Sequence, residues 1–371
     1  MGNKVKELLQ YLDIVIDSRQ KRKVRHKMGD IIALVLFALL ANVEYWEEIE
    51  LFGNEYEDFL KEYLELPNGI PSHDTIQRVM AIVSSEYLQG LQILWNEMLN
   101  TGEGERIQKI LAIDGKTQCG NGTKKQKPNH IVSIVDEDGF CLGEKRVSEK
   151  SNEITAIPGL LDKLNVKGHI ITIDAMGTQT EIVKTIRRKR ADYVLALKGN
   201  QASLHEEVKE YFKDQEILSK CAKTRTIEKA RGGIETREYW QSEDVGWLSQ
   251  KKDWAGLKSI AMTQNTIEKD GKKTSQTRYY ISSLPLNVEE IARAIRKHWM
   301  VESYHWHLDV TFREDENQTI EKQAAFNLNI MRKLALNTLK IFDAGRKLSL
   351  RSKRFVISLN PVKYLTKVLN M

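Results

Sequence analysis

The chain has 371 residues, of which 41% are hydrophobic and 29% charged, and its net charge is +6. This composition is typical of a globular protein with two or three domains and enough apolar material for a core. Three cysteines without a CxxC pair argue against a zinc site and against a disulfide framework. The longest apolar run, 31–41, is too short to span a bilayer, so the sequence predicts a cytoplasmic protein without membrane contact.

Residues 1–105 have apolar positions at helical spacing and predict a helical N-terminal domain. A turn at 67–71 gives this region a helix–turn–helix outline, which fits DNA binding but also any helical domain. Six basic residues lie between Arg19 and Lys27, where they form either a phosphate-binding cluster or a solvated linker.

Residues 106–198 alternate strand-like and helix-like patterns, in the order strand, strand, strand, helix, strand, helix, strand. The first strand pattern ends in Asp114, and the fourth ends in Asp174. Residues 199–285 then have a strand-rich pattern, and the helical stretch that follows carries Glu302.

These three acids suit one kind of site. An acid at the tip of an apolar strand projects from a rigid sheet, where its oxygens are able to hold a hard cation. Two Mg²⁺ ions about 3.5–4 Å apart clamp the attacking and leaving oxygens of a phosphodiester. A single Asp at a strand end is more often a helix cap or a turn former, so only the combination of three acids indicates a metal site.

Longer motifs surround the acids, and together they resemble a known family. They lie at 112–116 (AIDGK), 150–158 (KSNEITAIP), 173–179 (IDAMGTQ), 193–201 (YVLALKGNQ) and 298–315 (HWMVESYHWHLDVTFRED). From about residue 25 to about residue 340 the chain resembles the H-repeat-associated (ISAs-type) insertion-sequence transposases, which are bacterial DDE enzymes.

The resemblance implies an α/β fold with an RNase H-like mixed-sheet catalytic core, a helical N-terminal domain and a β-rich insertion. In such a core the first and fourth strands are neighbours, which brings Asp114 and Asp174 together. The resemblance also implies that Asp114, Asp174 and Glu302 are the catalytic triad and bind two Mg²⁺ ions, with Mn²⁺ as a substitute. Five parts are predicted: a DNA-binding helical domain (1–105), the first part of the core (106–198), the insertion (199–285), the Glu-bearing part of the core (286–345) and a basic tail (346–371).

Five further residues are candidates for auxiliary or DNA contacts. Lys116 either steadies a phosphate near the metals or caps the sheet edge, and Lys198 with Asn200 forms either a close approach to DNA or an ordinary turn. His298, Glu302 and Asp309 are spaced to share one helix face, where His298 is either a phosphate-binding cation or a neutral core residue.

The chain departs from its relatives at several positions. Where related transposases carry Tyr, Arg and Lys around the catalytic Glu, this sequence has Ile295, His298 and Asp309. The family's His-Gly-Arg-Ile-Glu-Thr-Arg is replaced by Arg-Gly-Gly-Ile-Glu-Thr-Arg at 231–237, which weakens the case for a DNA contact there. His305 and His307 point to different helix faces and are not predicted to form a metal pair.

The last forty residues are basic. Residues 332–371 contain ten Lys and Arg and one acid, which indicates either contact with a polyanion or a solvated basic helix face.

The predicted function is that of a transposase that cleaves DNA with metal ions and transfers the strands of an insertion sequence. Its partners are then the DNA of the element ends and of the target, and the protein forms a homo-oligomer on DNA, associated with the bacterial nucleoid when active. One alternative is a nuclease of the same fold that cleaves without strand transfer. Another is a transposase-derived DNA-binding protein without catalytic activity.

Overall fold

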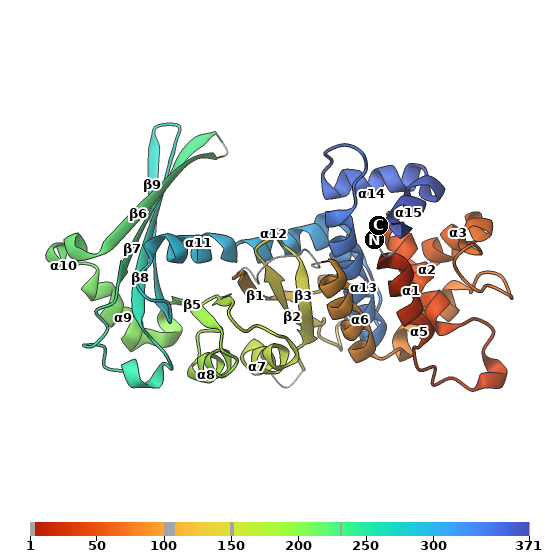
Figure 1. Cartoon of the computed structure of the whole chain (residues 1–371), viewed down its shortest axis with the longest axis horizontal. Helices are drawn as coiled ribbons and strands as arrows, with labels where there is room; N and C mark the ends of the chain where they lie inside the picture. The colour runs from red at the N-terminus through yellow and green to blue at the C-terminus, as the bar shows by residue number, and fades with distance from the viewer. Residues whose placement is uncertain (1–3, 100–107, 149–151, 231, 371) are drawn as a thin grey trace.

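One nine-stranded mixed sheet runs through most of the protein and carries helices on both faces (Figure 1). The computed structural model describes residues 4–99, 108–148, 152–230 and 232–370. The predicted domain boundary at 105, and Lys150, Ser151 and Arg231 of the motifs, therefore lie outside the described residues. Within the described ranges, no helix has both the length and the apolar character needed to cross a membrane.

The strand order is β3-β2-β1-β4-β5-β9-β8-β7-β6. The central strand β1 (Ile110–Thr117) is antiparallel to β2 (His130–Asp136) and parallel to β4 (Ile170–Ile173), which in turn is parallel to β5 (Asp192–Leu197). The predicted pairing of the first and fourth strands is thus confirmed. The remaining strands are β3 (Cys141–Arg146), β6 (Ala222–Ala230), β7 (Gly233–Ser242), β8 (Ser259–Lys269) and β9 (Lys272–Ser282).

Strand β1 is apolar because both of its faces are covered. Leu111 and Ile113 pack with α7 (Glu153–Lys163) and α8 (Thr180–Arg188). Side chains alternate along a strand, so Ala112 faces the other way and packs with the cluster that includes residues of α12 and α13.

Figure 1 shows α11 (Val288–His298) and α12 (Met300–Trp306) crossing one face of the sheet, while α7 and α8 lie on the other. The Glu-bearing helix therefore reaches the edge of β1 from the face opposite to α7.

The insertion extends the core sheet instead of forming a separate one. Strand β9 pairs antiparallel with β5, and β8, β7 and β6 follow in order. Asp270 and Gly271, which join β8 to β9, both have positive φ, as a tight two-residue hairpin requires. The insertion is not purely β, because α9 (Ala202–Tyr211) and α10 (Gln215–Lys220) precede its strands.

The N-terminal helices share one apolar core with the end of the chain. Every residue of α2 is buried, and α13 packs against α2, α5 and α6. This core includes residues from both the predicted 1–105 and 286–345 parts. The helices of this region are α1 (Lys4–Asp13), α2 (Met28–Leu40), α3 (Trp46–Glu55), α4 (Glu57–Leu60), α5 (His73–Ile82), α6 (Ser85–Leu99), α13 (Lys322–Ile341), α14 (Leu350–Leu359) and α15 (Pro361–Leu369).

Several cations of the basic C-terminal region are internal. Arg354 and Arg332 are each 1% exposed and pair with the buried carboxylate of Glu44, at 2.6 and 3.1 Å. Lys333 is also buried and pairs with Glu144 at 3.4 Å. For these three residues the interpretation as a surface that contacts a polyanion is wrong, because their charges neutralise acids inside the fold.

The Glu44 cluster should be necessary for stability. Replacing Glu44 with Gln leaves two buried guanidinium groups without an acid, and we expect unfolding to become easier by about 3–5 kcal/mol. The exposed Glu47 in the following helix is the matched control, since Glu47→Gln removes the same charge at the surface. Urea denaturation of both variants tests this expectation, and equal midpoints would show that the cluster contributes little.

Candidate active site

Three acids from separate parts of the chain line one pocket. Ile113 and Ile173 are paired in the parallel β1–β4 ladder, so Asp114 and Asp174 follow at the same edge of the sheet. Glu302 lies in the first turn of α12, which crosses this edge. The pocket has a volume of about 310 Å³, and its walls also include Lys198 and His298.

Asp114 is held between helix α12 and the other acids. Its Oδ2 lies 3.5 Å from Nδ1 of His305, and its side chain is 28% exposed. Burial raises the pKa of Asp114 to about 7, against the effect of the Gly115 backbone N–H, and the carboxylates of Glu153, Asp174 and Glu302 raise it further. The raised pKa therefore reflects burial first and the neighbouring negative charges second.

A tight turn fixes Asp174. Its Oδ1 accepts hydrogen bonds from the backbone N–H groups of Met176 (3.0 Å) and Gly177 (3.3 Å). The side chain of Asn200 donates to the carbonyl of Ala175 at 2.5 Å and supports the same turn. The turn alternative for Asn200 therefore matches the structure, whereas Lys198 is exposed beside the pocket.

The helix that carries Glu302 is not continuous, contrary to expectation. α11 ends at His298, Trp299 (φ −65°, ψ −6°) separates it from α12, and α12 passes into a π-helical segment at His307–Thr311. Glu302 is exposed at the pocket, where burial raises its pKa and the nearby Arg278 opposes the rise. The predicted common helix face is therefore not found: His298 and Glu302 line the pocket, but Asp309 does not.

Asp309 belongs to an ion cluster around Lys116. The Nζ atom of Lys116 lies 2.7 Å from Asp309, 3.1 Å from Asp315 and 3.2 Å from Glu314, and its side chain is 11% exposed. The ammonium group of Lys116 thus pairs with three acids of the chain, one of which is Asp309.

His298 packs beside the pocket against strand β4. Its Nδ1 lies 3.1 Å from the hydroxyl of Thr172, and burial lowers its pKa to about 4, against the effect of Asp174. These surroundings favour the alternative of a neutral, packed ring over that of a phosphate-binding cation.

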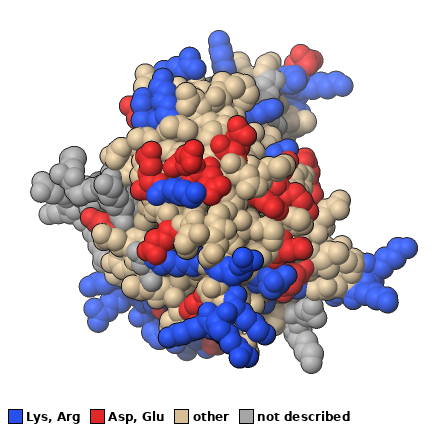
Figure 2. All heavy atoms as spheres, turned by 90° about the vertical axis from the view of Figure 1, so that its right-hand side faces the viewer, with Lys and Arg blue, Asp and Glu red and all other residues tan. Residues whose placement is uncertain are grey.

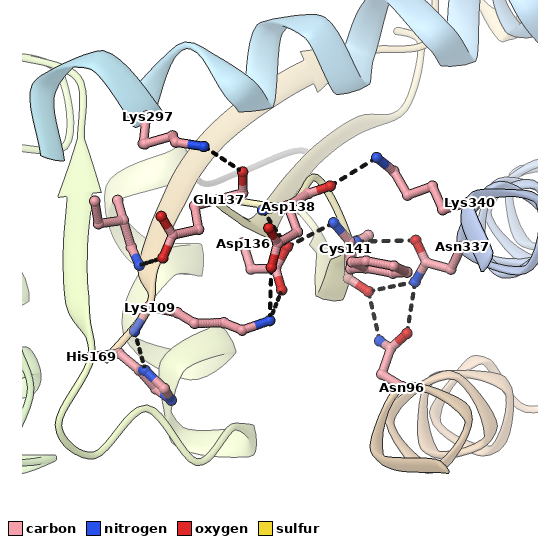
Figure 3. Close-up of polar contacts among 12 residues, drawn as sticks. Asn96, Lys109, Asp136, Glu137, Asp138, Cys141, His169, Lys297, Asn337 and Lys340 are labelled. Carbon is pink, nitrogen blue, oxygen red and sulfur yellow. Dashed lines mark hydrogen bonds and ion pairs between the residues drawn. The ribbon is translucent and has the colours of Figure 1, made fainter. Parts of the chain in front are cut away.

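The turn between β2 and β3 contacts both α11 and α13, as Figure 3 shows for Lys297 and Lys340. The carboxylate of Glu137 forms an ion pair with Arg293 of α11 at 2.6 Å, and the backbone carbonyl of Glu137 accepts a hydrogen bond from Lys297 at 3.3 Å. On the other side, Lys340 of α13 donates to the carbonyl of Asp138 at 2.9 Å. The β2–β3 turn thus fixes the helix before Glu302 relative to the sheet.

Comparison with known proteins now gives the family. Residues 105–338 match the family described as "Transposase DDE domain", and residues 9–96 match the one described as "DDE_Tnp_1-associated". The chain belongs to the DDE transposase family. The resemblance seen in the motifs is thereby confirmed.

Curated relatives of this transposase-family protein cover nearly its whole length. It is 38% identical over 375 residues to "Putative transposase YncI" of Escherichia coli O157:H7, covering 98% of this chain and 95% of that protein. It is 37% identical to "H repeat-associated putative transposase YhhI" of E. coli K12, covering 94% of each. A shorter relative, "Inactive transposase YbfQ" of E. coli K12, is 47% identical over 77 residues, 21% of this chain and 92% of that protein.

The site of this transposase has the ligand chemistry for a hard divalent cation. Carboxylate oxygens are the ligands such ions prefer. The pKa of Asp114 is raised mainly by burial and further by the carboxylates of Glu153, Asp174 and Glu302, and a cation at the site would counter both effects. Among the described residues, no three or more acidic, His or Cys side chains are already close enough to hold an ion. The donor set therefore fits a metal chemically, and binding requires the carboxylates to draw closer.

Sequence reasoning missed several residues of the site. His305 was considered only with His307, yet it contacts Asp114, and Arg278 lies over the ring of Trp299 at 4.8 Å beside Glu302. Glu153, which raises the pKa of Asp114, lies in the family motif at 150–158. Its place in that motif could have marked it as a site residue, although no role was predicted for it.

The raised pKa of Asp114 predicts an unusual dependence of stability on pH in the metal-free protein. The folded pKa is about 7 and the ordinary value is 3.8, so the folded state binds more protons between these pH values. The free energy of unfolding should then fall as pH rises from about 4 to about 7, and level off above. Asp114→Asn should lack this pH-dependent part of the free energy of unfolding. Urea denaturation in EDTA at several pH values measures it, and the same pH dependence in both proteins would contradict the expectation.

Proposed function

We propose that this chain is a transposase that cleaves DNA strands and transfers the ends of an insertion sequence to target DNA. The observation that carries the proposal is the convergence of Asp114, Asp174 and Glu302 on one pocket of a DDE-family domain. An RNase H-like core is part of the proposal. It is supported by the strand order β3-β2-β1-β4-β5, in which β2 is antiparallel to β1 and β3, while β1, β4 and β5 are parallel.

The three acids would hold the metal ions and orient the reacting phosphodiester. Two Mg²⁺ ions, for which Mn²⁺ would substitute, would supply Lewis acidity to the attacking and leaving oxygens. Asp114 and Asp174 are fixed by the sheet and its turn, while Glu302 approaches from α12. No side chain needs to act as nucleophile, since water attacks in cleavage and a freed 3′-hydroxyl attacks in joining.

DNA would approach the pocket from the side on which Lys198 is exposed. Further exposed cations are available at Arg346 and Lys347, between α13 and α14, and at Arg351 in the first turn of α14. Such residues would contact phosphates, and binding would weaken as salt concentration rises. A homo-oligomer assembled on DNA remains part of this proposal.

The helical end of the molecule is less suited to DNA as a whole. Figure 2 faces this end and shows acidic and basic side chains in separate groups. Residues 44–65 contain nine acids and one Lys. In the basic cluster at 19–27, Arg19 pairs with Asp17 at 2.6 Å and Lys27 with Glu65 at 3.1 Å. Phosphate contact at this end would therefore involve the remaining cations of that cluster.

Substitution of the triad tests the function directly. Asp114→Asn, Asp174→Asn and Glu302→Gln each remove one ligand charge at nearly constant shape. Each should lower Mg²⁺-dependent cleavage of element-end DNA by about 100-fold or more, while DNA binding stays measurable. The control is Glu181→Gln, which removes an exposed acid paired with Lys184 on α8.

Three outcomes are informative. Near-full cleavage by any one triad variant would show that this residue is not a ligand. Cleavage without joining in the wild-type protein would indicate a nuclease of the same fold. DNA binding with no cleavage under any metal condition would indicate a DNA-binding protein derived from a transposase.

A further inference from the structure

A fourth carboxylate lies next to the proposed metal triad. Glu153 is the first residue of α7, and its Oε1 lies 2.6 Å from Nε2 of His130 in β2. The other ring nitrogen of His130 lies 2.8 Å from the hydroxyl of Thr117 in β1. When Nε2 carries the proton, His130 donates to Glu153 and accepts from Thr117, so the carboxylate is oriented from behind.

Gly115 provides the space in which this pair lies. A Cβ atom at Gly115 would lie 2.2 Å from Oε1 of Glu153 and 2.7 Å from Nε2 of His130. Any other residue would therefore push the Glu153–His130 pair away from β1. Its missing side chain allows the carboxylate to rest against the strand immediately beside Asp114.

Glu153 and Asp114 approach one open edge from opposite faces of the sheet. Asp114 faces α12, where it contacts His305, and alternation turns Gly115 toward α7 and Glu153. The pairing of β1 with β4 ends at Ile113, so no strand covers the β4 side of β1 at Asp114 and Gly115. Glu153 lines a different cavity from the one that holds the triad, yet its charge reaches Asp114 and raises the pKa of that acid.

We propose that Glu153 is a fourth carboxylate of the divalent-metal site, oriented by His130 and admitted by Gly115. This inference rests on the proposed function, because it assumes that Asp114 holds a metal ion. A fourth acid adds negative charge and one more oxygen ligand, and hard cations commonly take six or more. Glu153 thereby makes the site bind metal more tightly than the triad alone.

The competing explanation is purely structural. Glu153 begins α7, where an acid is favourable at the positive end of the helix, and it pairs with His130. If that were its whole role, Glu153→Gln would destabilise the metal-free protein and leave its affinity for metal unchanged.

Direct Mn²⁺ binding separates the two explanations. Calorimetric titration with Mn²⁺, in the absence of DNA, should show affinity about tenfold or more weaker in Glu153→Gln than in the wild type. The melting temperature in EDTA should stay equal or rise, because one of several repelling acids is gone. Glu153→Asp keeps the charge and should recover part of the affinity, and the control Glu181→Gln should bind as the wild type does.

The results overturn the proposal in defined ways. Wild-type Mn²⁺ affinity in Glu153→Gln would exclude Glu153 as a ligand. If Asp114→Asn loses Mn²⁺ binding and Glu153→Gln does not, only this inference fails. A wild-type protein that binds no Mn²⁺ would overturn both this inference and the proposed function.

Discussion

The parallel register of β1 and β4 is the constraint on which the site depends. It places Ile113 beside Ile173, so that Asp114 and Asp174 leave the sheet side by side. Both faces of β1 are covered, with Leu111 and Ile113 packed toward α7 and α8 and the smaller Ala112 packed on the other face. A slip of one residue would exchange large and small side chains between these two packed faces, which makes the register costly to shift. Two acids are therefore held together even though they repel each other, and the energy for this comes from apolar packing.

Elsewhere in the described residues, acidic groups inside the fold pair with cations of the chain. Glu44 has Arg332 and Arg354, and the acids around Lys116 share that one ammonium group. At the pocket, by contrast, the pKa of Asp114 stays raised, with burial as the main cause and three neighbouring carboxylates adding to it. The same fold thus satisfies charge where it needs stability and leaves negative charge in excess where a cation from outside would bind.

Local pattern predicted the core well and its helical cover less well. The two strands that position Asp114 and Asp174, and their pairing, followed from apolar runs and their order along the chain. The predicted end of the first strand at Asp114 is wrong, because β1 continues to Thr117 in its pairing with β2. The break at Trp299 and the π-helical segment did not, because a spacing of four and seven residues assumes an ideal helix, whereas packing against the sheet decides where this one bends. Charge counts also misled: Arg354 looks like a surface cation in sequence, and only the distant Glu44 explains its burial. Glu153 escaped notice for the same reason, since its relation to Gly115 arises between elements.

The central claim is that the three acids together form a divalent-metal site. The most direct measurement is a crystal structure of the protein soaked in Mn²⁺, with anomalous diffraction used to locate the ions. The account predicts anomalous peaks within coordination distance, about 2.0–2.2 Å, of carboxylate oxygens from Asp114, Asp174 and Glu302. Ordered Mn²⁺ at other acids, with this pocket free of anomalous signal, would contradict it.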